Sequence, residues 1–274
     1  MTTQHAPQTL GQTSVGRDTS VGRDQESLVA GQFGPQAAAY VASAVHAQGE
    51  DLRQLADLVA GKGYKTALDL GCGGGHVAFT VAPYVGQVVA CDLSPDMLAA
   101  VAAEAGRRGL TNVETRVGRA DAVPAGDAQF CAVFSRYSAH HWPDLAAGLR
   151  EARRGMKPGG IAVFMDVVTP GHPLLDTFLQ STELLRDPSH VRNYSVAEWR
   201  AALAGARFEV GRVTQRRLRL EFTSWIARMD PPDSHVAAIR SLQGRMADTV
   251  TRHFAIEADG TFTLDTATFE AVPV

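Results

Sequence analysis

Residues 66–79, which read TALDLGCGGGHVAF, constrain the fold of this chain more than any other segment. Apolar residues lead up to Leu70, four glycines follow within five positions, and an apolar periodic segment opens at Val77. This order predicts a strand, a tight turn and a helix. Glycines at such a turn let the backbone approach a ligand closely, and the first amides of the helix point into the same space. We therefore expect a site for a nucleotide-like ligand at this turn.

A residue with a carboxylate side chain, Asp69, comes just before the glycine turn. This carboxylate would repel a diphosphate and attract a ligand that carries an ammonium group. The dinucleotide-binding fingerprint needs glycines at the first, third and sixth positions of the turn. Gly71 and Gly73 satisfy the first two requirements, but His76 occupies the sixth position. The turn therefore disfavours a nicotinamide dinucleotide, although an NAD(P)-dependent oxidoreductase remains an alternative.

The next apolar stretch, residues 88–92, also ends in an acid, Asp92. It follows the glycine turn by about twenty residues, which is the spacing of the carboxylate that binds ribose hydroxyls in nucleotide-binding α/β folds. A carboxylate at a strand end can accept two charge-assisted hydrogen bonds at once. The sequence therefore predicts recognition of a ribose but not of a pyrophosphate.

Strand and helix patterns alternate through the middle of the chain. The strand candidates are 65–70, 88–92, 113–117, 130–135 and 161–166, and the helical stretches lie near 76–84, 95–108 and 144–154. Such alternation predicts a mostly parallel sheet with helices on both faces and a ligand site at the carboxyl ends of the strands. The residues at those ends are Asp69, Asp92, Asp121, residues 135–141 and Asp166.

The N-terminal part of the chain differs from this core. Residues 1 to about 30 are rich in Thr, Gln, Ser and Gly and contain one hexapeptide twice, at 13–18 and 19–24. Two copies cannot build a repeat fold, so we expect a disordered tail. Residues 36–59 are predicted to form two helices with a break at Gly49.

The C-terminal part is predicted to add helices and two strands. Helices are expected at 173–185, after the capping box at 195–198, and from Ser234 through Phe254, with strands at 208–220 and 262–269. We expect a single domain over residues 31–274. In this domain, residues 60–170 form the core, and residues 171–274 contribute a helical cap and the last two strands.

Several segments carry a family resemblance. Residues 68–75, LDLGCGGG, and residues 91–98, CDLSPDML, resemble the first two motifs of class I S-adenosylmethionine-dependent methyltransferases. Segments 118–124, 130–142 and 154–160 are similar to later motifs of the family and follow in the right order. Within the family, the chain most resembles the group that includes ubiquinone- and menaquinone-biosynthesis C-methyltransferases. The resemblance implies an α/β fold: a Rossmann-like, doubly wound sheet of seven strands, mostly parallel with an antiparallel edge strand, plus a helical cap.

The resemblance implies S-adenosyl-L-methionine as cofactor and gives the first two motifs their roles. Asp69 would hold the ammonium group of the cofactor. The amides of Gly71 and Gly73 would accommodate its methionine and ribose part, and Asp92 would accept hydrogen bonds from both ribose hydroxyls. Helix capping or loop hydrogen bonding is the alternative role of the two carboxylates.

Other residues would complete the cofactor site. Leu93 and Met97 would enclose the adenine ring, and Asp121, next to Ala120, would accept a hydrogen bond from its exocyclic amine. Membership of the core is the alternative for these residues.

Two further segments are implied near the methionine part of the cofactor. Ser135 and Arg136 would close the site near the sulfonium. The family places the first helix before the sheet over the cofactor, where Tyr40 and His46 would touch the methionine part. A core tyrosine and a surface histidine are the alternatives for these two.

Methyl transfer is an in-line displacement, in which an enzyme mainly has to hold nucleophile, methyl group and sulfur on one line. His140 and His141 are the candidates for a general base, because histidine titrates near neutral pH. Contact with the cofactor or orientation of the loop is the alternative role. A metal site that adds Asp144 to these two is not expected, because adjacent histidines point apart.

Composition narrows the choice of partners. The 274 residues carry a net charge of −3, with a pI near 6.3, which provides no field that would attract nucleic acid or an anionic membrane. The longest Ala/Val-rich run, residues 37–45, is too short to span a bilayer. Cys72, Cys91 and Cys131 have neither metal-ligand nor Cys-x-x-Cys spacing, so we expect a reducing, cytoplasmic environment.

The predicted cap carries residues suited to a largely apolar pocket. These residues are Phe178, Trp199, Phe222, Trp225 and Met229. We therefore predict methyl transfer to a small aromatic or apolar metabolite. A protein that binds the cofactor without catalysing a reaction is the second alternative. The methylated atom (carbon, nitrogen or oxygen) and the oligomeric state stay open.

Overall fold

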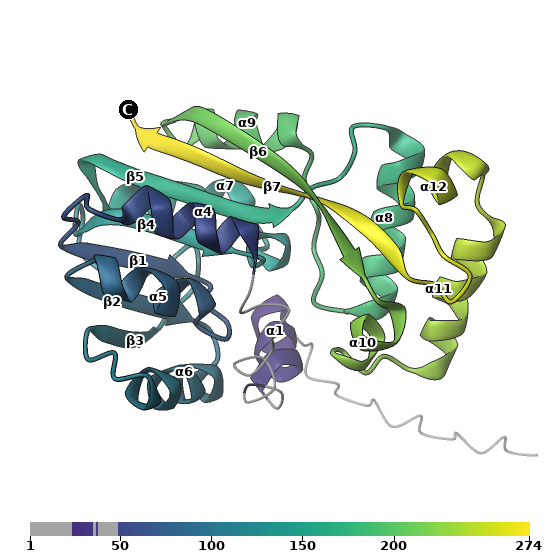
Figure 1. Cartoon of the computed structure of the whole chain (residues 1–274), viewed down its shortest axis with the longest axis horizontal. Coiled ribbons are helices and arrows are strands. Elements are labelled where there is room, and N and C mark those ends of the chain that lie inside the picture. The colour runs from purple at the N-terminus through teal and green to yellow at the C-terminus, as the bar shows by residue number, and fades with distance from the viewer. Residues whose placement is uncertain (1–23, 35–36, 38–48) are drawn as a thin grey trace, which may run out of the picture.

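One sheet of seven strands runs through the molecule (Figure 1). The computed structural model describes residues 24–34, 37 and 49–274. The strands are β1 (Thr66–Leu70), β2 (Gln87–Asp92), β3 (Val113–Val117), β4 (Phe130–Arg136), β5 (Met156–Val167), β6 (Phe208–Leu220) and β7 (Phe262–Pro273). Their order across the sheet is β3-β2-β1-β4-β5-β7-β6. Strands β1 to β5 pair in parallel, whereas β7 runs antiparallel to both β5 and β6. The predicted seven-stranded, mostly parallel α/β sheet is confirmed, but the antiparallel strand is β7, which lies between β5 and β6 rather than at the edge of the sheet.

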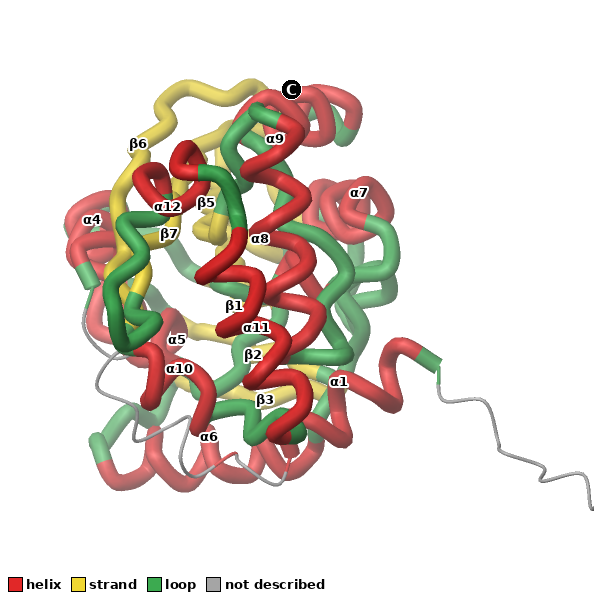
Figure 2. Tube along the Cα trace, turned by 90° about the vertical axis from the view of Figure 1, so that its right-hand side faces the viewer, coloured by secondary structure: helices red, strands yellow, loops and turns green. Residues whose placement is uncertain are grey.

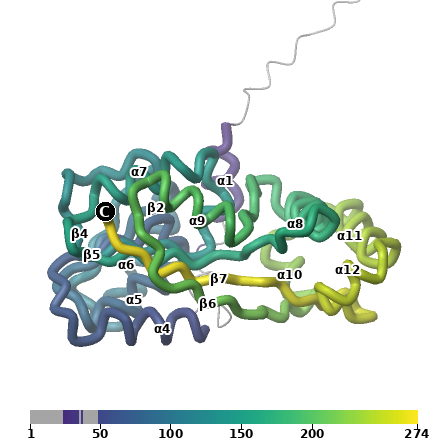
Figure 3. The backbone as a smooth tube through the Cα atoms, turned by 90° about the horizontal axis from the view of Figure 1, so that it is seen from above, coloured from purple at the N-terminus to yellow at the C-terminus, as the bar shows by residue number. Residues whose placement is uncertain are grey.

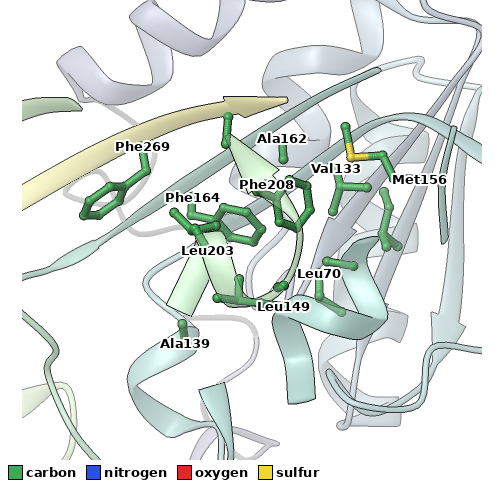
Figure 4. Close-up of a cluster of buried hydrophobic side chains, with 14 of the residues drawn as sticks. Leu70, Val133, Ala139, Leu149, Met156, Ala162, Phe164, Leu203, Phe208 and Phe269 are labelled. Carbon is green, nitrogen blue, oxygen red and sulfur yellow. The ribbon is translucent and has the colours of Figure 1, made fainter. Parts of the chain in front are cut away.

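Helices cover both faces of this sheet. The first face packs against α4 (Glu50–Val59), α5 (His76–Val81) and α6 (Pro95–Arg107), and the second against α7 (Leu145–Gly155) and α9 (Val196–Gly205). Figure 3 shows α7 and α9 opposite α4 and α5. Side chains of β5 alternate between the two faces: Phe164 joins the cluster of α7 and α9 (Figure 4). Val163 and Met165 join the cluster of α4 and α5. Two short 3₁₀ helices, Ala82–Tyr84 and Ala139–His141, complete the loops.

A helical cap surrounds the far ends of β6 and β7 (Figures 1 and 2). It consists of α8 (Pro173–Arg186), α10 (Phe222–Ala227), α11 (Asp233–Arg245) and α12 (Asp248–His253). These helices share their own apolar core, which includes Phe178, Trp225 and Phe254. Among the described helices, none combines the length and the apolar composition that a bilayer crossing requires.

The cap differs from its prediction at one helix. The helix expected from Ser234 through Phe254 is divided into α11 and α12, because the chain is extended at Met246. Ser234 is not the N-cap, since Pro232 occupies that position. The break lets Phe254 turn into the cap core, where its ring centroid lies 5.0 Å from that of Phe178.

Helix α1 (Gln25–Phe33) lies partly in the segment expected to be disordered, so that prediction is wrong for residues 25–30. Asp24 caps α1 by accepting a hydrogen bond from the amide of Ser27 at 2.8 Å. Distant parts of the chain hold the helix: the Gln25 side chain donates to the carbonyl of Ser189 at 2.5 Å, and that of Gln32 to the carbonyl of Met229 at 3.0 Å. Residues 1–23, Tyr40 and His46 lie outside the described residues.

Candidate active site

A first cavity lies at the carboxyl ends of β1, β2 and β4, where the sheet is expected to bind ligands. All predicted cofactor residues line it except Ser135: Asp69, Gly71, Gly73, Asp92, Leu93, Met97, Ala120, Asp121 and Arg136. Helix α1 adds four residues to the lining: Gln25, Glu26, Val29 and Phe33. Composition gave no signal for this contribution, because α1 falls in the polar N-terminal segment.

The glycine turn has the backbone conformation that its sequence predicts. Gly71 and Gly73 have φ values of 68° and 46°, in the left-handed region that side chains disfavour. A Cβ atom on Gly71 would overlap the hydroxyl group of Ser138, whereas a Cβ on Gly73 would meet no atom within 4 Å among the described residues. The first glycine is therefore needed for packing, and the second leaves space in the cavity.

We expect Gly71→Ala to reduce the free energy of unfolding by about 2–4 kcal/mol, because backbone strain and overlap with Ser138 add. Gly73→Ala, the matched control, carries the backbone strain alone and should lose about 1–2 kcal/mol. Urea denaturation of the ligand-free proteins measures both losses. Equal losses in the two variants would contradict the packing role of Gly71.

Asp69 caps a helix and lines the first cavity as well. Its Oδ2 accepts a hydrogen bond from the amide of Ala78 in α5 at 3.0 Å. Burial raises the pKa of Asp69 to about 7; the charge of Asp92 acts in the same direction, and the Ala78 amide and Arg136 oppose it. Two neighbouring carboxyl groups in a buried cavity favour a cationic ligand.

Asp92 organises the turn from the end of β2. Its Oδ2 accepts a hydrogen bond from the amide of Gly73 at 2.9 Å, and its Oδ1 accepts one from the amide of Ser94 at 3.0 Å. Burial raises the pKa of Asp92, and these backbone hydrogen bonds oppose that rise. The Asp92 side chain therefore forms hydrogen bonds within the loop and also lines the first cavity.

Asp121 lies at the edge of the first cavity in an ion pair. Both of its carboxylate oxygens accept hydrogen bonds from the guanidinium of Arg119, at 2.8 Å and 2.9 Å. The hydrogen bond from Arg119 lowers the pKa of Asp121. Arg119 also pairs with Glu26, which ties α1 to the loop after β3.

Ser135 does not take the place expected for it. Its side chain is 2% exposed, and its hydroxyl oxygen has no hydrogen-bond partner among the described residues. Successive side chains of a strand alternate, so Arg136 points to the cavities while Ser135 points into the sheet packing. Arg136 forms an ion pair with Asp51 of α4, with 2.5 Å between Nε and Oδ2. No sequence pattern indicated Asp51 as this partner.

A second cavity of about 540 Å³ lies between the strand ends and the cap. It shares four residues of its lining with the first cavity: Phe33, Arg136, Tyr137 and His141. Of the five cap residues expected in an apolar pocket, Trp225 and Met229 line the second cavity. Phe178, Trp199 and Phe222 are buried in the packing of the protein instead.

His140 lines the second cavity and is held by Asp166 at the end of β5. The Nδ1 atom of His140 lies 2.7 Å from Oδ1 of Asp166, and its amide donates to Oδ2 at 3.2 Å. The carboxylate fixes the tautomer with hydrogen on Nδ1, so Nε2 is the proton acceptor. Burial alone would lower the pKa of His140, but the charge and hydrogen bond of Asp166 outweigh burial and raise it. The sequence pattern correctly placed Asp166 at the carboxyl end of its strand, but it did not indicate the pairing with His140.

The other two histidines of the second cavity are weak bases. His141 lies with Nδ1 3.1 Å from the carbonyl oxygen of Ser189, and burial followed by the charge of His140 lowers its pKa to about 4. Burial and the charges of both neighbours lower the pKa of His190 to about 2. His140 is therefore the strongest base of the three.

In the part of the chain that the structure describes, no three His, Cys, Asp or Glu side chains are placed to hold a metal ion. Asp144 caps α7 by accepting a hydrogen bond from the amide of Ala147 at 2.9 Å.

The model of a protein family described as "Methyltransferase domain" matches residues 68–164 of this chain. The Escherichia coli protein YafE, described as uncharacterised, is 48% identical over 191 residues, which are 70% of this chain and 92% of that protein. YcgJ of Bacillus subtilis, described as an uncharacterised methyltransferase, is 31% identical over 224 residues, 82% of this chain and 88% of that protein. A demethylmenaquinone methyltransferase of Chlorobaculum parvum is 33% identical over 118 residues, 43% of this chain and 47% of that protein.

The solved structure of YcgJ is similar to the structure of this chain over the same extent. It superimposes with a TM-score of 0.78 and 28% identity, covering 82% of this chain and 98% of that one. These matches favour neither an NAD(P)-dependent oxidoreductase nor a binding protein without activity. The chain belongs to the class I S-adenosylmethionine-dependent methyltransferases, and S-adenosylmethionine is its cofactor.

Proposed function

We propose that this methyltransferase modifies a small molecule held in the second cavity and that His140 is its general base. The proposal rests on the wall that the two cavities share, formed by Phe33, Arg136, Tyr137 and His141. A cofactor in the first cavity and an acceptor in the second would meet at this wall. In-line displacement requires the acceptor to approach the methyl group from the side opposite the sulfur.

The residues of the first cavity fit S-adenosylmethionine. A carboxyl group with a pKa near 7, Asp69, would be stabilised in its ionised form by the ammonium group of the cofactor. Asp92 uses its two oxygens for one backbone amide each, which leaves a lone pair on each oxygen for the ribose hydroxyls. Leu93 and Met97 would enclose the adenine, with Asp121 at its edge.

Bound S-adenosylmethionine supplies an electrophilic methyl group on a positively charged sulfur. The chain contributes position and a proton acceptor. Nε2 of His140 would accept the proton of an acidic O–H or N–H group of the substrate as the new bond to carbon forms. Asp166 would stabilise the resulting imidazolium through its contact with Nδ1 at 2.7 Å. His141 would serve as a neutral part of the shared wall.

The lining of the second cavity supports a substrate with an apolar body and one polar end. Its apolar side chains are Phe33, Val167, Leu218, Leu220, Trp225, Met229 and Leu264. Polar and charged side chains (tyrosine, histidine, asparagine, glutamine, threonine, arginine and carboxylates) form the remainder, together with Gly49. The apolar group of residues supports the aromatic or apolar metabolite that the cap composition predicts.

Transfer of a labelled methyl group tests the proposal directly. The purified protein is incubated with methyl-labelled S-adenosylmethionine and a panel of small aromatic and apolar metabolites, and the products are identified by mass spectrometry. We expect label in at least one metabolite and S-adenosylhomocysteine in equal amount. Label recovered in protein or nucleic acid, with none in any metabolite, would refute a small-molecule acceptor.

The raised pKa of Asp69 predicts that cofactor binding depends on pH. A cationic ligand binds the ionised carboxylate, so below pH 7 the group must first lose a proton. We expect S-adenosylhomocysteine to bind about tenfold more weakly at pH 6 than at pH 8, measured by calorimetry. Asp69→Asn keeps an oxygen for the Ala78 amide and should bind weakly and equally at both values. Equal affinity of the wild-type protein at the two pH values would exclude the ammonium contact.

We also propose a single domain over residues 31–274 and a cytoplasmic location. The first proposal is supported by the sheet, in which β6 and β7 continue the strands of the core. The second is supported by Cys72, Cys91 and Cys131, none of which forms a disulfide within the described residues.

A further inference from the structure

Asn193 lines the second cavity with a polar group that nothing in the described protein satisfies. The residue is 1% exposed. Neither Nδ2 nor Oδ1 of its side chain has a hydrogen-bond partner among the residues that the structure describes. An amide that is buried without partners destabilises a folded protein, and such groups are rare in native structures.

The backbone of Asn193 is held by hydrogen bonds, in contrast to its side chain. Gln180 of α8 donates from Nε2 to the carbonyl of Asn193 at 2.7 Å and accepts from the amide of Asn193 at 3.0 Å. The same Gln180 oxygen lies 2.9 Å from Nε2 of His190. The backbone of Asn193 is therefore fixed, whereas its side chain has no hydrogen bonds of its own among the described residues.

The segment that carries Asn193 also holds the proposed base. The amides of Val191 and Arg192 both donate to the carbonyl of His140, at 2.8 Å and 3.1 Å. The rings of His140 and His190 lie 5.9 Å apart between centroids. A group bound by Asn193 would therefore lie on the side of the cavity where His140 acts.

The charges in the second cavity are largely balanced within the protein. Four of its arginines form ion pairs: Arg136 with Asp51, Arg186 with Glu183, Arg216 with Glu50 and Arg217 with Asp265. Balanced charges favour a neutral polar group over an anion. An asparagine amide offers one donor group and one acceptor, and its complement presents the same pair in reverse.

We infer that Asn193 recognises the methyl acceptor through a neutral carboxamide, lactam or similar group, which presents one hydrogen-bond donor and one acceptor side by side. Both amide atoms are buried in the free protein, so the side chain has to rotate toward the cavity to bind this group. This inference rests on the proposed function, because it takes the second cavity as the substrate site. It adds the chemical class of the substrate and the residue that selects it.

Asn193→Leu tests the inference, because leucine has a similar size and no polar atoms. Removal of an unsatisfied amide should raise the melting temperature by roughly 2–4 °C. The matched control is Asn112→Leu, since Nδ2 of Asn112 donates to the carbonyls of Ala82 and Val85 at 2.9 Å and 3.0 Å. This control should lower the melting temperature. A lower melting temperature for Asn193→Leu would show that the amide is satisfied in the free protein, and would overturn the inference.

The second measurement uses ligands. Aromatic carboxamides and lactams, and esters of the same shape, are titrated against wild-type protein saturated with S-adenosylhomocysteine. We expect the amides to bind better than their matched esters, and Asn193→Leu to weaken amide binding roughly ten- to hundredfold while ester binding stays unchanged. Amides that bind wild type no better than esters, or that bind Asn193→Leu equally well, would overturn the inference. Labelled methyl transfer to an acceptor without such a group would leave the proposed function standing and refute this inference alone.

Discussion

Replacement of His140 by asparagine is expected to lower kcat by about 10²–10⁴-fold, the contribution that a general base makes. Asparagine keeps a donor near the position of Nδ1, so the contact with Asp166, now 2.7 Å, can persist. It has no atom that replaces Nε2 as proton acceptor. Affinity for S-adenosylhomocysteine should not change, because the described lining of the first cavity does not include His140. The acceptor found by labelled transfer serves as substrate for the kinetics.

The chain offers a matched control for this variant. His253 forms a second histidine–carboxylate pair, with 2.8 Å between Nε2 and Oδ2 of Asp265, and lines neither described cavity. His253→Asn should keep kcat near the wild-type value. Wild-type activity in His140→Asn, or an equal loss in both variants, would rule out a specific role of His140 in proton transfer.

The pH dependence of kcat tests how Asp166 positions this base. The base must be neutral, so activity should rise with pH through the pKa of His140, which Asp166 raises above its ordinary value, and then level off. Asp166→Asn removes the charge that raises the pKa, so its rising limb should move to lower pH. The plateau should also fall, because the tautomer is no longer fixed. A lower plateau with an unmoved limb would indicate a structural role only.

Local patterns were sufficient to predict the sheet. Strands β1 to β4 begin and end within one residue of their predicted bounds, because β1, β2 and β4 are buried apolar stretches and β3 alternates apolar and polar residues. Strand β5 starts earlier than expected, at Met156 rather than residue 161. The chain pairs with β4 already at Met156, through an irregular register before residue 161. Local propensity cannot reveal such pairing.

The cofactor cavity was predictable where its residues belong to strand ends, and the second cavity was not. Asp69 comes just before the glycine turn and Asp92 ends the next strand, and both positions follow from the sequence pattern. The pairing of His140 with Asp166 joins residues 26 positions apart, and it depends on how the loop after β4 folds over β5. Whether the amide of Asn193 is satisfied depends on packing between α8 and α9, which no sequence pattern records.

Replacement of Asp92 by asparagine should weaken the binding of S-adenosylhomocysteine by about 1.5–3 kcal/mol, or roughly ten- to 150-fold. The variant keeps one side-chain oxygen but loses the charge and one acceptor. The amides of Gly73 and Ser94, now 2.9 Å and 3.0 Å from the two oxygens, then compete with the ribose for what remains. Calorimetry measures the change.

The ligand-free stability of this variant separates binding from folding. Burial raises the pKa of Asp92, which means that its ionised form is held at a cost in the empty protein. Loss of the buried charge therefore offsets part of the lost hydrogen bonding, and the melting temperature should change little. Asp96→Asn, an exposed acid in the first turn of α6, is the matched control and should bind as the wild type does. If Asp92→Asn retains full affinity, the ribose is not held by this carboxylate; if affinity and melting temperature fall together, Asp92 acts on the glycine turn rather than on the cofactor.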